Sequence, residues 1–546
     1  MNRDDLTECQ WEVLRAIAPP RSRVLVLGGP GSGKTATALW AARTFLEGPE
    51  ASSSDRVLFL TFSRTGVSQI AQRAPEILSG EGDRIEICTF HALAYRILRL
   101  FGRYAGFGPA LAPIQSDARR RLLGDAQEEF HYDDLIPAAL TILRGSARVR
   151  GLLAVRWALV ICDEVQDISD DQWELVELVG TRRQLLLGDP NQLIYTFIPG
   201  VSDQRFAELC RSVDQIIEFE PQSHRDPSGA IPALADAVRR RQFRDPAVSG
   251  AISAGRLSVI AGVLPEEYPA ILPTEVARAR SAGARTIGIF GHSNAGVAET
   301  AHALQSCGIE HVLVGIPEAH AEALAAMSTM CAFAVGLATE TDVRTALALF
   351  ITSATRGATP PELALGFQGV RPLPTGLPEL LDGLLSDLRH VSSGTLGNLV
   401  QIAADAWRRL RIGAGTAPWT RAAAHLTSLA RPIVSQAADD ESIRLLQAIV
   451  ERSRMEALVD LDWSQAGSVS LMNFHQTKGR EADAVILVYR PGDYLANRAT
   501  REPFEEASRL LYVAMTRARE RVVVVLPPEP HALVAPFEDL VMINAK

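Results

Sequence analysis

Residues 23–47 read RVLVLGGPGSGKTATALWAARTFLE. An apolar run is followed by a glycine-rich loop and then by an alanine-rich segment, the order of a strand, a turn and a helix. The loop fits the pattern GxxxxGK[ST], which gains weight here because it follows a predicted strand and precedes a predicted helix. Its glycines let backbone N–H groups turn inward around a phosphate, so the stretch predicts a nucleotide site at the start of a βα unit.

The last residues of this loop have separate expected roles. Lys34 is expected to reach the β- and γ-phosphates, and Thr35 to offer its hydroxyl to Mg²⁺. The residues expected to bind the nucleotide here are Gly28, Gly29, Pro30, Gly31, Ser32, Gly33, Lys34, Thr35 and Ala36.

Short apolar runs rich in β-branched residues recur along the chain and alternate with helical segments. In the first half of the chain they lie at 56–62, 84–90, 158–164 and 184–189. In the second half they lie at 286–294, 311–315, 468–474, 483–489 and 521–527. Such alternation is typical of parallel sheets covered on both faces, and it predicts two α/β lobes.

Two alanine- and leucine-rich stretches with helical spacing interrupt these lobes. The predicted domains are a first lobe at 1–94 and 156–245, a small helical insert at 95–155, a second lobe at 246–317 and 465–546, and a larger helical insert at 318–464. The Gly- and Pro-rich segment 356–376 is expected to be a loop within the larger insert.

The bulk composition limits the classes of partner. With 546 residues, 47% apolar and 22% charged, the chain has an ordinary globular composition. Its net charge of −9 disfavours wrapping of nucleic acid by bulk electrostatics, so any nucleic-acid track must be local. Basic clusters at 119–121, 239–244 and 408–411 are candidates for such a track or simply solvated helix faces.

Cysteine usage and hydropathy point to a cytoplasmic protein without a membrane segment. The six cysteines stand at positions 9, 88, 162, 210, 307 and 331. They include no CxxC pair, which disfavours a zinc or iron–sulfur site, and we expect them to be reduced.

Lysine occurs only at positions 34, 478 and 546, so 52 of the 55 basic residues are arginine. The two interior lysines are expected at sites where a compact ammonium is needed and a guanidinium would not fit.

Two carboxylates follow a predicted strand directly. Asp163 and Glu164 come after the apolar run ALVIC, where the first can hold Mg²⁺ and the second can polarise an attacking water. Ligands bind at the carboxyl ends of parallel strands, so we expect the glycine-rich loop and this pair to cap neighbouring strands.

The pair belongs to DEVQD (163–167), which resembles the DExQD box of superfamily 1 helicases. Further segments resemble boxes of the same family in the same order: LTECQ (6–10), TFSRT (61–65), TFHALA (89–94), GDPNQLIYTF (188–197), SHRDP (223–227), NFHQTKGREA (473–482) and EEASRLLYVAMTRARE (505–520). The chain thus resembles UvrD- and Rep-type helicases from residue 6 to residue 520. The resemblance implies two RecA-like lobes with helical inserts.

The resemblance also implies roles in ATP turnover. Gln10 is expected to read the adenine edge, Gln192 to sense the γ-phosphate and Glu481 to touch the ribose. Phosphoryl transfer spreads charge over the phosphate oxygens, and arginines supplied across a cleft can stabilise it. Arg225 and Arg517 are the candidates. The expected catalytic set is therefore Lys34, Glu164, Gln192, Arg225 and Arg517, with Thr35 and Asp163 as metal ligands.

Contacts to single-stranded DNA are also implied by the resemblance. Aromatic side chains can stack on bases without reading sequence, although each of them could instead be a core aromatic at a strand end. The residues expected to contact DNA are Phe62, Arg64, Thr89, His91, Tyr195, Phe197 and His475.

Several positions depart from the family pattern. His224 stands where the family has a tyrosine that stacks on adenine, Ser223 replaces an asparagine, and Arg64-Thr65 replaces Asn-Lys. On the second lobe, Asn473 replaces a threonine and Arg480-Glu481-Ala482 replaces Leu-Glu-Phe. Histidine can still stack, so His224 is kept among the nucleotide-binding residues. These departures and the short inserts bear on the unwinding of duplex more than on ATP hydrolysis or DNA binding.

Two functions remain open from the sequence. The first is an ATP- and Mg²⁺-dependent helicase or translocase that moves 3′ to 5′ on single-stranded DNA or tailed duplex. The second is a DNA-sensing ATPase subunit that gates a separate nuclease with little unwinding of its own, because short chains of this kind resemble the helicase components of phage-defence systems such as Gabija. An ordinary repair helicase of small size is equally compatible with the sequence.

Overall fold

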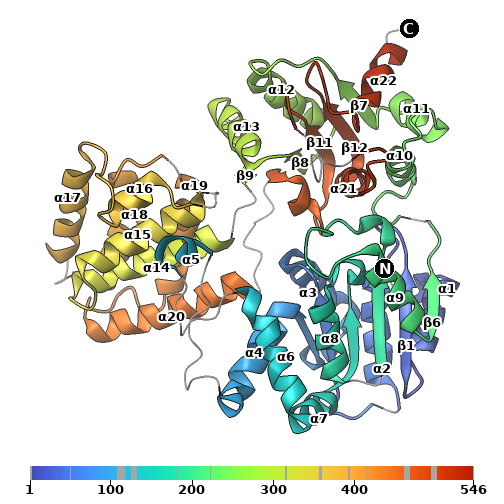
Figure 1. Ribbon diagram of the computed structural model, residues 1–546, viewed down its shortest axis with the longest axis horizontal. Coiled ribbons are helices and arrows are strands. Elements are labelled where there is room, and N and C mark those ends of the chain that lie inside the picture. Colours follow the sequence, from blue (N-terminus) through green and yellow to red (C-terminus); the bar gives the residue numbers. More distant parts are fainter. Residues whose placement is uncertain are drawn as a thin grey trace. The chain divides into compact units, whose positions relative to one another are not determined.

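The computed structural model describes residues 3–49, 51–106, 117–124, 132–180, 183–221, 223–313, 317–355, 359–390, 394–413, 415–459, 468–493 and 501–544. The chain forms two compact units (Figure 1). Unit 1 comprises residues 1–90, 140–314 and 464–546, and unit 2 comprises residues 91–139 and 315–463.

Unit 1 contains two parallel sheets of six strands each. The strands of the first sheet, in the order β3-β2-β4-β5-β1-β6, are β1 (Ser22–Leu27), β2 (Arg56–Thr61), β3 (Ile85–Thr89), β4 (Trp157–Cys162), β5 (Arg183–Gly188) and β6 (Gln215–Glu218). All of its pairings are parallel. Val24 and Val26 of β1 pack in one core with the helices on their face, whereas Leu25 points to the opposite face and is also fully buried. Both faces of the sheet are therefore covered, as a parallel sheet requires.

The second sheet has the order β7-β12-β11-β8-β10-β9. Its strands are β7 (Leu257–Ile260), β8 (Ile287–Gly291), β9 (Val312–Leu313), β10 (Val469–Asn473), β11 (Ala482–Val488) and β12 (Ala518–Val525). Alternate residues of β11 belong to two different cores, Val485 and Leu487 to one and Ile486 and Val488 to the other. This two-sided burial follows from the run AVILV, which has no polar residue to place in solvent.

The helices of unit 1 connect and cover these strands. They are α1 (Glu8–Ala16), α2 (Lys34–Glu47), α3 (Arg64–Leu78), α7 (Ala147–Arg156), α8 (Asp170–Val179), α9 (Asp203–Ser212), α10 (Ala230–Arg239), α11 (Pro246–Ser253), α12 (Tyr268–Ser281), α13 (Asn294–Ser306), α21 (Glu505–Met515) and α22 (Pro536–Asn544). Single 3₁₀ turns follow the strands at η5 (Val165–Asp167), η6 (Pro190–Gln192) and η7 (Phe474–Thr477). Helix α6 (Leu135–Gly145) crosses the boundary between the two units.

Unit 2 is a helical bundle around one apolar core (Figure 1). The helices around this core are α14 (Pro317–Ala334), α15 (Glu340–Ala354), α16 (Glu362–Phe367), α17 (Leu377–His390), α18 (Leu396–Arg409), α19 (Thr416–Ala430) and α20 (Asp440–Val459), with α5 (Asp117–Leu123) packed against α15. Helix α4 (Phe90–Phe101) belongs to unit 2 from His91 onward and contributes no described residue to this core. Phe350, Trp407 and Trp419 meet at its centre with ring centroids 4.6–5.0 Å apart. Aromatic pairs at these distances contribute about 0.5–1.5 kcal/mol each beyond their area burial.

The expected fold class is confirmed, with three corrections in detail. The glycine-rich loop and the Asp163–Glu164 pair do not cap neighbouring strands, because β5 lies between β1 and β4. The edge strands β6 and β7 were not predicted; each has only four residues, too few for a clear periodic signal. The predicted domain boundaries stay a prediction. The expected loop at 356–376 is wrong in part, because residues 362–367 within it form a short helix; residues 356–358 lie outside the described residues.

Candidate active site

The glycine-rich loop leaves β1 at Leu27 and ends at the first residue of α2. Gly31 and Gly33 have φ angles of +76° and +89°, a left-handed conformation that side chains rarely adopt. A Cβ on Gly31 would lie 2.5 Å from Ser223 Oγ, and one on Gly33 would lie 3.0 Å from Gln10 Nε2. Glycine is therefore needed at both positions, for the turn and for the close approach of neighbouring segments.

The start of α2 presents two polar side chains. Lys34 Nζ donates to the carbonyl oxygens of Gly28 at 2.5 Å and Gly29 at 3.1 Å, so the ammonium folds back along the loop. Thr35 Oγ1 donates to Asp163 Oδ2 at 2.9 Å. The predicted metal ligands thus lie within hydrogen-bonding distance of each other, although 128 residues separate them in sequence.

Asp163 and Glu164 follow β4 and lie in different electrostatic environments. Burial and the neighbouring Glu164 raise the pKa of Asp163 to about 6. Burial also opposes ionisation of Glu164, but Lys478 and then Lys34 outweigh it, and its pKa falls to about 2. Glu164 adopts a left-handed backbone with φ of +59°, an uncommon conformation for a residue with a side chain. Glu164 is thus ionised and set at a sharp turn, as a water-polarising carboxylate must be.

One cavity of about 860 Å³ in unit 1 collects most of the predicted nucleotide-binding and catalytic residues. The predicted residues that line it are Pro30, Gly31, Ser32, Gly33, Lys34, Thr35, Ala36, Asp163, Glu164, Gln192, His224, Arg225, Glu481 and Arg517. Glu481 directly precedes β11, and Arg517 directly precedes β12, so the cavity is built from both lobes. Gly28 and Gly29 lie at the base of the loop, where their carbonyls accept from Lys34.

Polar contacts across this cavity join the two lobes. Gln192 donates through Nε2 to Asp189 Oδ2 at 2.8 Å and accepts from Arg517 Nη2 at 3.1 Å. Burial and the nearby Arg225 lower the pKa of Arg517 to about 10. The Gln192 side chain therefore links an acidic loop of the first lobe to a buried cation of the second.

Arg225 is held by residues of the second lobe. Its Nη1 donates to the Thr516 carbonyl at 2.5 Å, and its Nη2 donates to Glu481 Oε1 at 2.7 Å. Burial opposes ionisation of Glu481, but Arg225 and then Arg519 lower its pKa to about 2. Glu481 is the ionised partner of Arg225, an expected arginine finger, and its expected contact with the ribose stays a prediction.

A smaller pocket of about 90 Å³ adjoins the loop through Ser32 and His224. Gln10 lies in this pocket and is 2% exposed. Its Oε1 accepts from the backbone N–H of Thr7 at 3.0 Å in the capping box of α1, which fixes the amide group. Gln10 and His224, the two residues expected at the adenine, therefore line one pocket beside the phosphate loop.

The residues present fit a nucleotide with a divalent cation. Ser32 Oγ is buried without a hydrogen-bond partner among the described residues, and Arg225 Nε is in the same condition. Both are donors at the cavity, so an anion there would satisfy them. Thr35 and Asp163 offer the hard oxygen ligands that Mg²⁺ prefers.

Four of the residues expected to contact DNA form an aromatic cluster, defined as Phe62, Tyr195, Phe197 and His475. Ring centroids lie 4.7 Å apart for Phe62 and Tyr195, 5.8 Å for Tyr195 and Phe197, and 5.3 Å for Phe197 and His475. Phe197 is 67% exposed, so the cluster has an accessible face. Tyr195 Oη donates to the His475 carbonyl at 3.1 Å, which ties the two lobes together here as well.

The other three expected contacts are not part of this cluster. Thr89 is 2% exposed at the end of β3, so its side chain offers no surface to a DNA strand. His91 belongs to unit 2, and the side chain of Arg64 lies outside the described residues. A DNA contact at His91 or Arg64 stays a prediction, and one at Thr89 would need its burial relieved.

Several residues at the site carried no expected role. Arg73 and Arg519 line the cavity and lie 3.9 Å and 3.0 Å from the Glu481 carboxylate. Lys478 pairs with Asp167 and lies 3.3 Å from Glu164. The scarcity of lysine pointed to Lys478, but its partners are more than 300 positions away in sequence. Arg519 lies in the box at 505–520 two residues after Arg517, but the box gave it no role of its own, and in an arginine-rich chain nothing marks Arg73.

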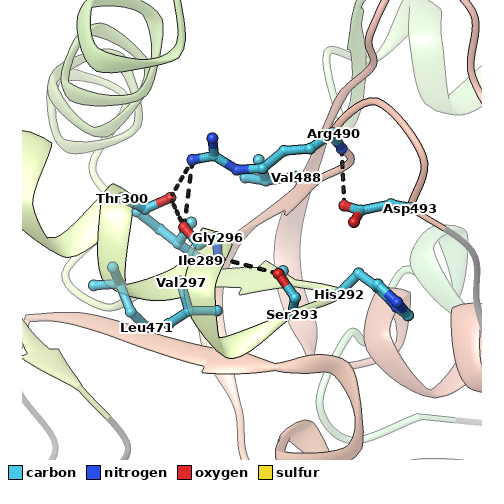
Figure 2. Close-up of a pocket in the computed structure, with 11 residues that line it drawn as sticks. Ile289, His292, Ser293, Gly296, Val297, Thr300, Leu471, Val488, Arg490 and Asp493 are labelled. Atoms are coloured by element: carbon cyan, nitrogen blue, oxygen red, sulfur yellow. Dashed lines mark hydrogen bonds between the residues drawn. The ribbon is translucent and has the colours of Figure 1, made fainter. Parts of the chain in front are cut away.

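A small pocket elsewhere in the second lobe is filled by the protein itself (Figure 2). There Arg490 donates to the Gly296 carbonyl and to Thr300 Oγ1, both at 3.3 Å, and its backbone N–H donates to Asp493 at 2.9 Å. Ser293 caps the start of α13 by accepting from Gly296 N–H at 3.1 Å. The pocket holds about 10 Å³, roughly the space of one water molecule. It is therefore no ligand site.

Comparison with known proteins fits this geometry. A family model described as an AAA domain matches residues 10–198, and one described as a UvrD-like helicase C-terminal domain matches residues 420–527. The chain belongs to the UvrD-like helicases of superfamily 1. The two matched regions together span more than half of this UvrD-like chain and contain Lys34, Glu164, Gln192, Glu481 and Arg517.

Curated relatives carry helicase names. DNA helicase II of Salmonella typhimurium is 31% identical over 131 residues, which cover 24% of this chain and 18% of the relative. ATP-dependent DNA helicase UvrD2 of Mycobacterium bovis is 23% identical over 593 aligned positions, covering 92% of this chain and 76% of the relative. The match to DNA helicase II thus spans under a fifth of that relative's length.

One solved structure is described as two coordinating Pif1 helicases at forked double-stranded DNA. The match covers 50% of this chain and 58% of the solved chain, at 15% sequence identity. Its TM-score is 0.25, too low to bear on the fold.

Among the described helices, none has the length and apolar character needed to cross a membrane.

Proposed function

We propose that this chain is an ATP-driven DNA helicase or translocase that moves 3′ to 5′ along single-stranded DNA. The observation that carries the proposal is the single cavity where the phosphate loop, the Asp163–Glu164 pair, Gln192, Arg225 and Arg517 come together. Residues of both lobes line it, so closing or opening of the lobes would change the surroundings of a bound triphosphate. That dependence is what a motor needs in order to convert turnover into movement.

The residues of the first lobe have the chemistry to bind and activate ATP. Backbone N–H groups of the loop and the ammonium of Lys34 would hold the phosphates. Thr35 and Asp163 would hold Mg²⁺, which neutralises phosphate charge when it is bound. Glu164, ionised at the turn after β4, would orient and polarise the attacking water.

The arginines supply positive charge from the far side of the cavity. An arginine finger contributes about 10³–10⁵ in rate during phosphoryl transfer. The hydrogen bonds of Arg517 go to neutral groups, Val513 O, Thr516 Oγ1 and Gln192 Oε1. Its charge is therefore available to a phosphate, whereas Arg225 must first exchange Glu481 for one.

The aromatic cluster would bind single-stranded DNA by stacking. Each stacked base contributes about 1–3 kcal/mol without regard to sequence, as a protein that moves along DNA requires. The accessible ring of Phe197 beside Tyr195 supports this role. The 3′ to 5′ polarity is taken from the resemblance to the family.

The test compares the wild-type chain with Glu164→Gln and with Glu266→Gln, which changes an exposed glutamate outside the cavity. ATP turnover is measured with and without oligo(dT), and strand displacement is measured on duplexes with a 3′ or a 5′ tail. The proposal predicts that oligo(dT) stimulates turnover and that the 3′-tailed duplex is separated preferentially. Glu164→Gln should lower both activities by about 10²- to 10⁴-fold, and Glu266→Gln should retain them.

Three outcomes divide the alternatives. Turnover that is indifferent to oligo(dT) would refute the motor. Preference for the 5′ tail would refute the polarity alone. Turnover that is stimulated by DNA without displacement of either duplex would favour the second function, a DNA-sensing subunit that gates a partner nuclease.

A further inference from the structure

Helix α7 buries fewer of its residues than the other ten-residue helices of unit 1. Leu153 is the one buried residue of α7, whereas α8, α9 and α10 bury four, three and five of their ten residues. A helix of this length is marginal in water and is stabilised mainly by the packing of an apolar face. Gly151, in the middle of α7, lowers its helix propensity further. The remaining faces of α7 thus lack the packing that the neighbouring helices have.

The exposed face of α7 carries two large aliphatic side chains. Leu152 is 55% exposed and Val155 is 79% exposed. Together with Arg148 they occupy positions i, i+4 and i+7, which lie in one stripe along a helix. Gly151 borders this stripe, and a Cβ on it would meet nothing within 4 Å. The spacing is that of the anchors by which an amphipathic helix packs against an apolar surface, and Gly151 leaves room for a second backbone to approach closely.

The charged residues of α7 are all basic. The helix contains Arg148, Arg150 and Arg156 and no acidic residue, in a chain whose net charge is −9. Arg156 pairs with Glu86, whereas Arg150 donates to backbone carbonyl oxygens at the end of α6, at 2.5 and 3.3 Å. Arg148 is exposed and has no ion-pair partner within the described part of the chain. Two of the three cations are therefore not neutralised by a described carboxylate, and carboxylates of a partner would complement them.

The aliphatic stripe favours a protein partner over a nucleic acid. Phosphate groups would complement the arginines, but a phosphate backbone would leave Leu152 and Val155 without an apolar surface to pack against. A protein helix whose apolar stripe is flanked by carboxylates can bury both side chains and pair with the free cation as well.

Helix α7 lies far from the nucleotide cavity. It ends at Arg156, directly before β4, and Asp163 follows the opposite end of that strand. At about 3.3 Å per residue, the six residues of β4 separate its two ends by about 20 Å. A helix bound to α7 would therefore leave the cavity open to its ligand.

We propose that the stripe of α7 formed by Arg148, Gly151, Leu152 and Val155 is a docking surface for an acidic amphipathic helix of another protein. Leu152 and Val155 pack into the apolar stripe of that helix, Gly151 admits its backbone at close range, and Arg148 pairs with a carboxylate beside the stripe. The surface is separate from the proposed function, since none of these residues lines the nucleotide cavity or belongs to the aromatic cluster.

The test uses two fluorescent peptides of about 18 residues, long enough to form a helix. Both have leucine at i, i+3, i+4 and i+7, and the residues beside this stripe are glutamate in one peptide and lysine in the other. Their Kd values for the full chain are measured by fluorescence anisotropy with the wild type, Leu152→Gln/Val155→Gln and Arg148→Glu. The matched control is Leu264→Gln/Val370→Gln, which changes two aliphatic side chains that are 43% and 66% exposed elsewhere. Basal ATP turnover reports whether each variant is folded.

The wild type should bind the glutamate peptide at least about tenfold more tightly than the lysine peptide, because only the glutamate peptide complements the arginines. Leu152→Gln/Val155→Gln should weaken binding of the glutamate peptide by about tenfold or more, as expected when anchors at the centre of an interface are lost. Arg148→Glu should bind the lysine peptide about threefold or more tightly than the wild type does, a gain that damage to the fold cannot produce. The control should bind both peptides as the wild type does, and all variants should keep its basal turnover. If the double variant lost turnover, the gain in Arg148→Glu would still decide.

Three results overturn the inference. The first is a wild type that does not bind the glutamate peptide or binds the two peptides equally. The second is a Kd for the glutamate peptide that stays within about twofold in Leu152→Gln/Val155→Gln, or an Arg148→Glu variant that binds the lysine peptide no better than the wild type. The third is another occupant: duplex DNA that binds at least about tenfold more weakly to Arg148→Glu would indicate a nucleic acid, and a dimer in sedimentation that Leu152→Gln/Val155→Gln dissociates would indicate a second copy. None of these results bears on the proposed function, which oligo(dT)-stimulated turnover tests.

Discussion

Arg517→Met should separate catalysis from stability. The Arg517 side chain is 3% exposed, and its hydrogen-bond acceptors are neutral groups. Burial and Arg225 lower its pKa from the usual 12.5 to about 10. At about 1.4 kcal/mol per pKa unit, the folded surroundings disfavour the cation by about 3 kcal/mol. Methionine removes that cost but also removes the hydrogen bonds of the guanidinium. Thr516 Oγ1 still donates to Val513 O, so the loss that nothing replaces is the bond to Gln192 Oε1, about 1.5–3 kcal/mol for a bond with one charged partner.

These opposing contributions are of similar size, so the free energy of unfolding without nucleotide should change by no more than about 2 kcal/mol. Arg454→Met provides the contrast. Burial opposes the cation there as well, but Glu322 and Glu451 outweigh it and raise the Arg454 pKa. Removing one member of such a buried pair costs about 3–5 kcal/mol, because the remaining carboxylate is left without its partner.

ATP turnover should fall strongly in Arg517→Met, although the stability changes little. Loss of an arginine finger lowers kcat by about 10³–10⁵, which corresponds to about 4–7 kcal/mol in the barrier. Urea unfolding without nucleotide and single-turnover ATP hydrolysis with oligo(dT) measure the two effects separately. A loss of stability in Arg517→Met as large as that in Arg454→Met would show that Arg517 is a structural residue. A kcat within about tenfold of the wild type would show that it is not an arginine finger.

Two further predictions follow from local geometry. His320, stacked on His425 at 5.3 Å, has a pKa lowered to about 4 by burial, His425 and Arg421. The unfolded chain binds this proton near pH 6.5, so the contribution of neutral His320 to the free energy of unfolding should be fully present above pH 6.5 and fall by up to about 3 kcal/mol as the pH drops towards 4. Unfolding of the wild type and of His320→Phe at pH 7.5, 6 and 5 measures this loss. The same dependence of unfolding free energy on pH in both proteins would contradict it. Gly33→Ala would place a methyl group 3.0 Å from Gln10 at a φ of +89°, so ATP should bind at least about tenfold more weakly by calorimetry, whereas Gly82→Ala, with open space around it, should bind normally.

The sequence predicted the parts of the fold that are locally encoded. Long apolar strands such as β11 show as continuous runs of apolar residues. The loop before α2 has a glycine and lysine pattern that few other local structures share. The short edge strands β6 and β7 lack such a signal, and their pairing with β1 and β12 depends on the rest of the sheet. The order of the strands in a sheet depends on contacts between residues far apart in sequence, so β5 was not expected between β1 and β4.

The candidate site shows the same division. Residues whose roles follow from a motif, such as Lys34 and Thr35, could be named from sequence. The burial of a side chain could not be predicted in this way. Thr89, an expected DNA contact, proves to be buried at the end of its strand. Pairings between lobes were also out of reach, because nothing in the sequence brings Lys478 to Asp167, 311 positions away.

The charges around the cavity suggest why a polyphosphate is the ligand that fits. Glu481 has a pKa of about 2, so it stays ionised near neutral pH and holds Arg225 in the absence of an anion. Protonation near neutral pH therefore does not release this arginine, whereas a competing anion of higher charge density can. Arg517, held by neutral acceptors, has no such competitor to displace. A polyphosphate carries more negative charge than a single phosphate, so it can better offset the cost of separating Arg225 from Glu481.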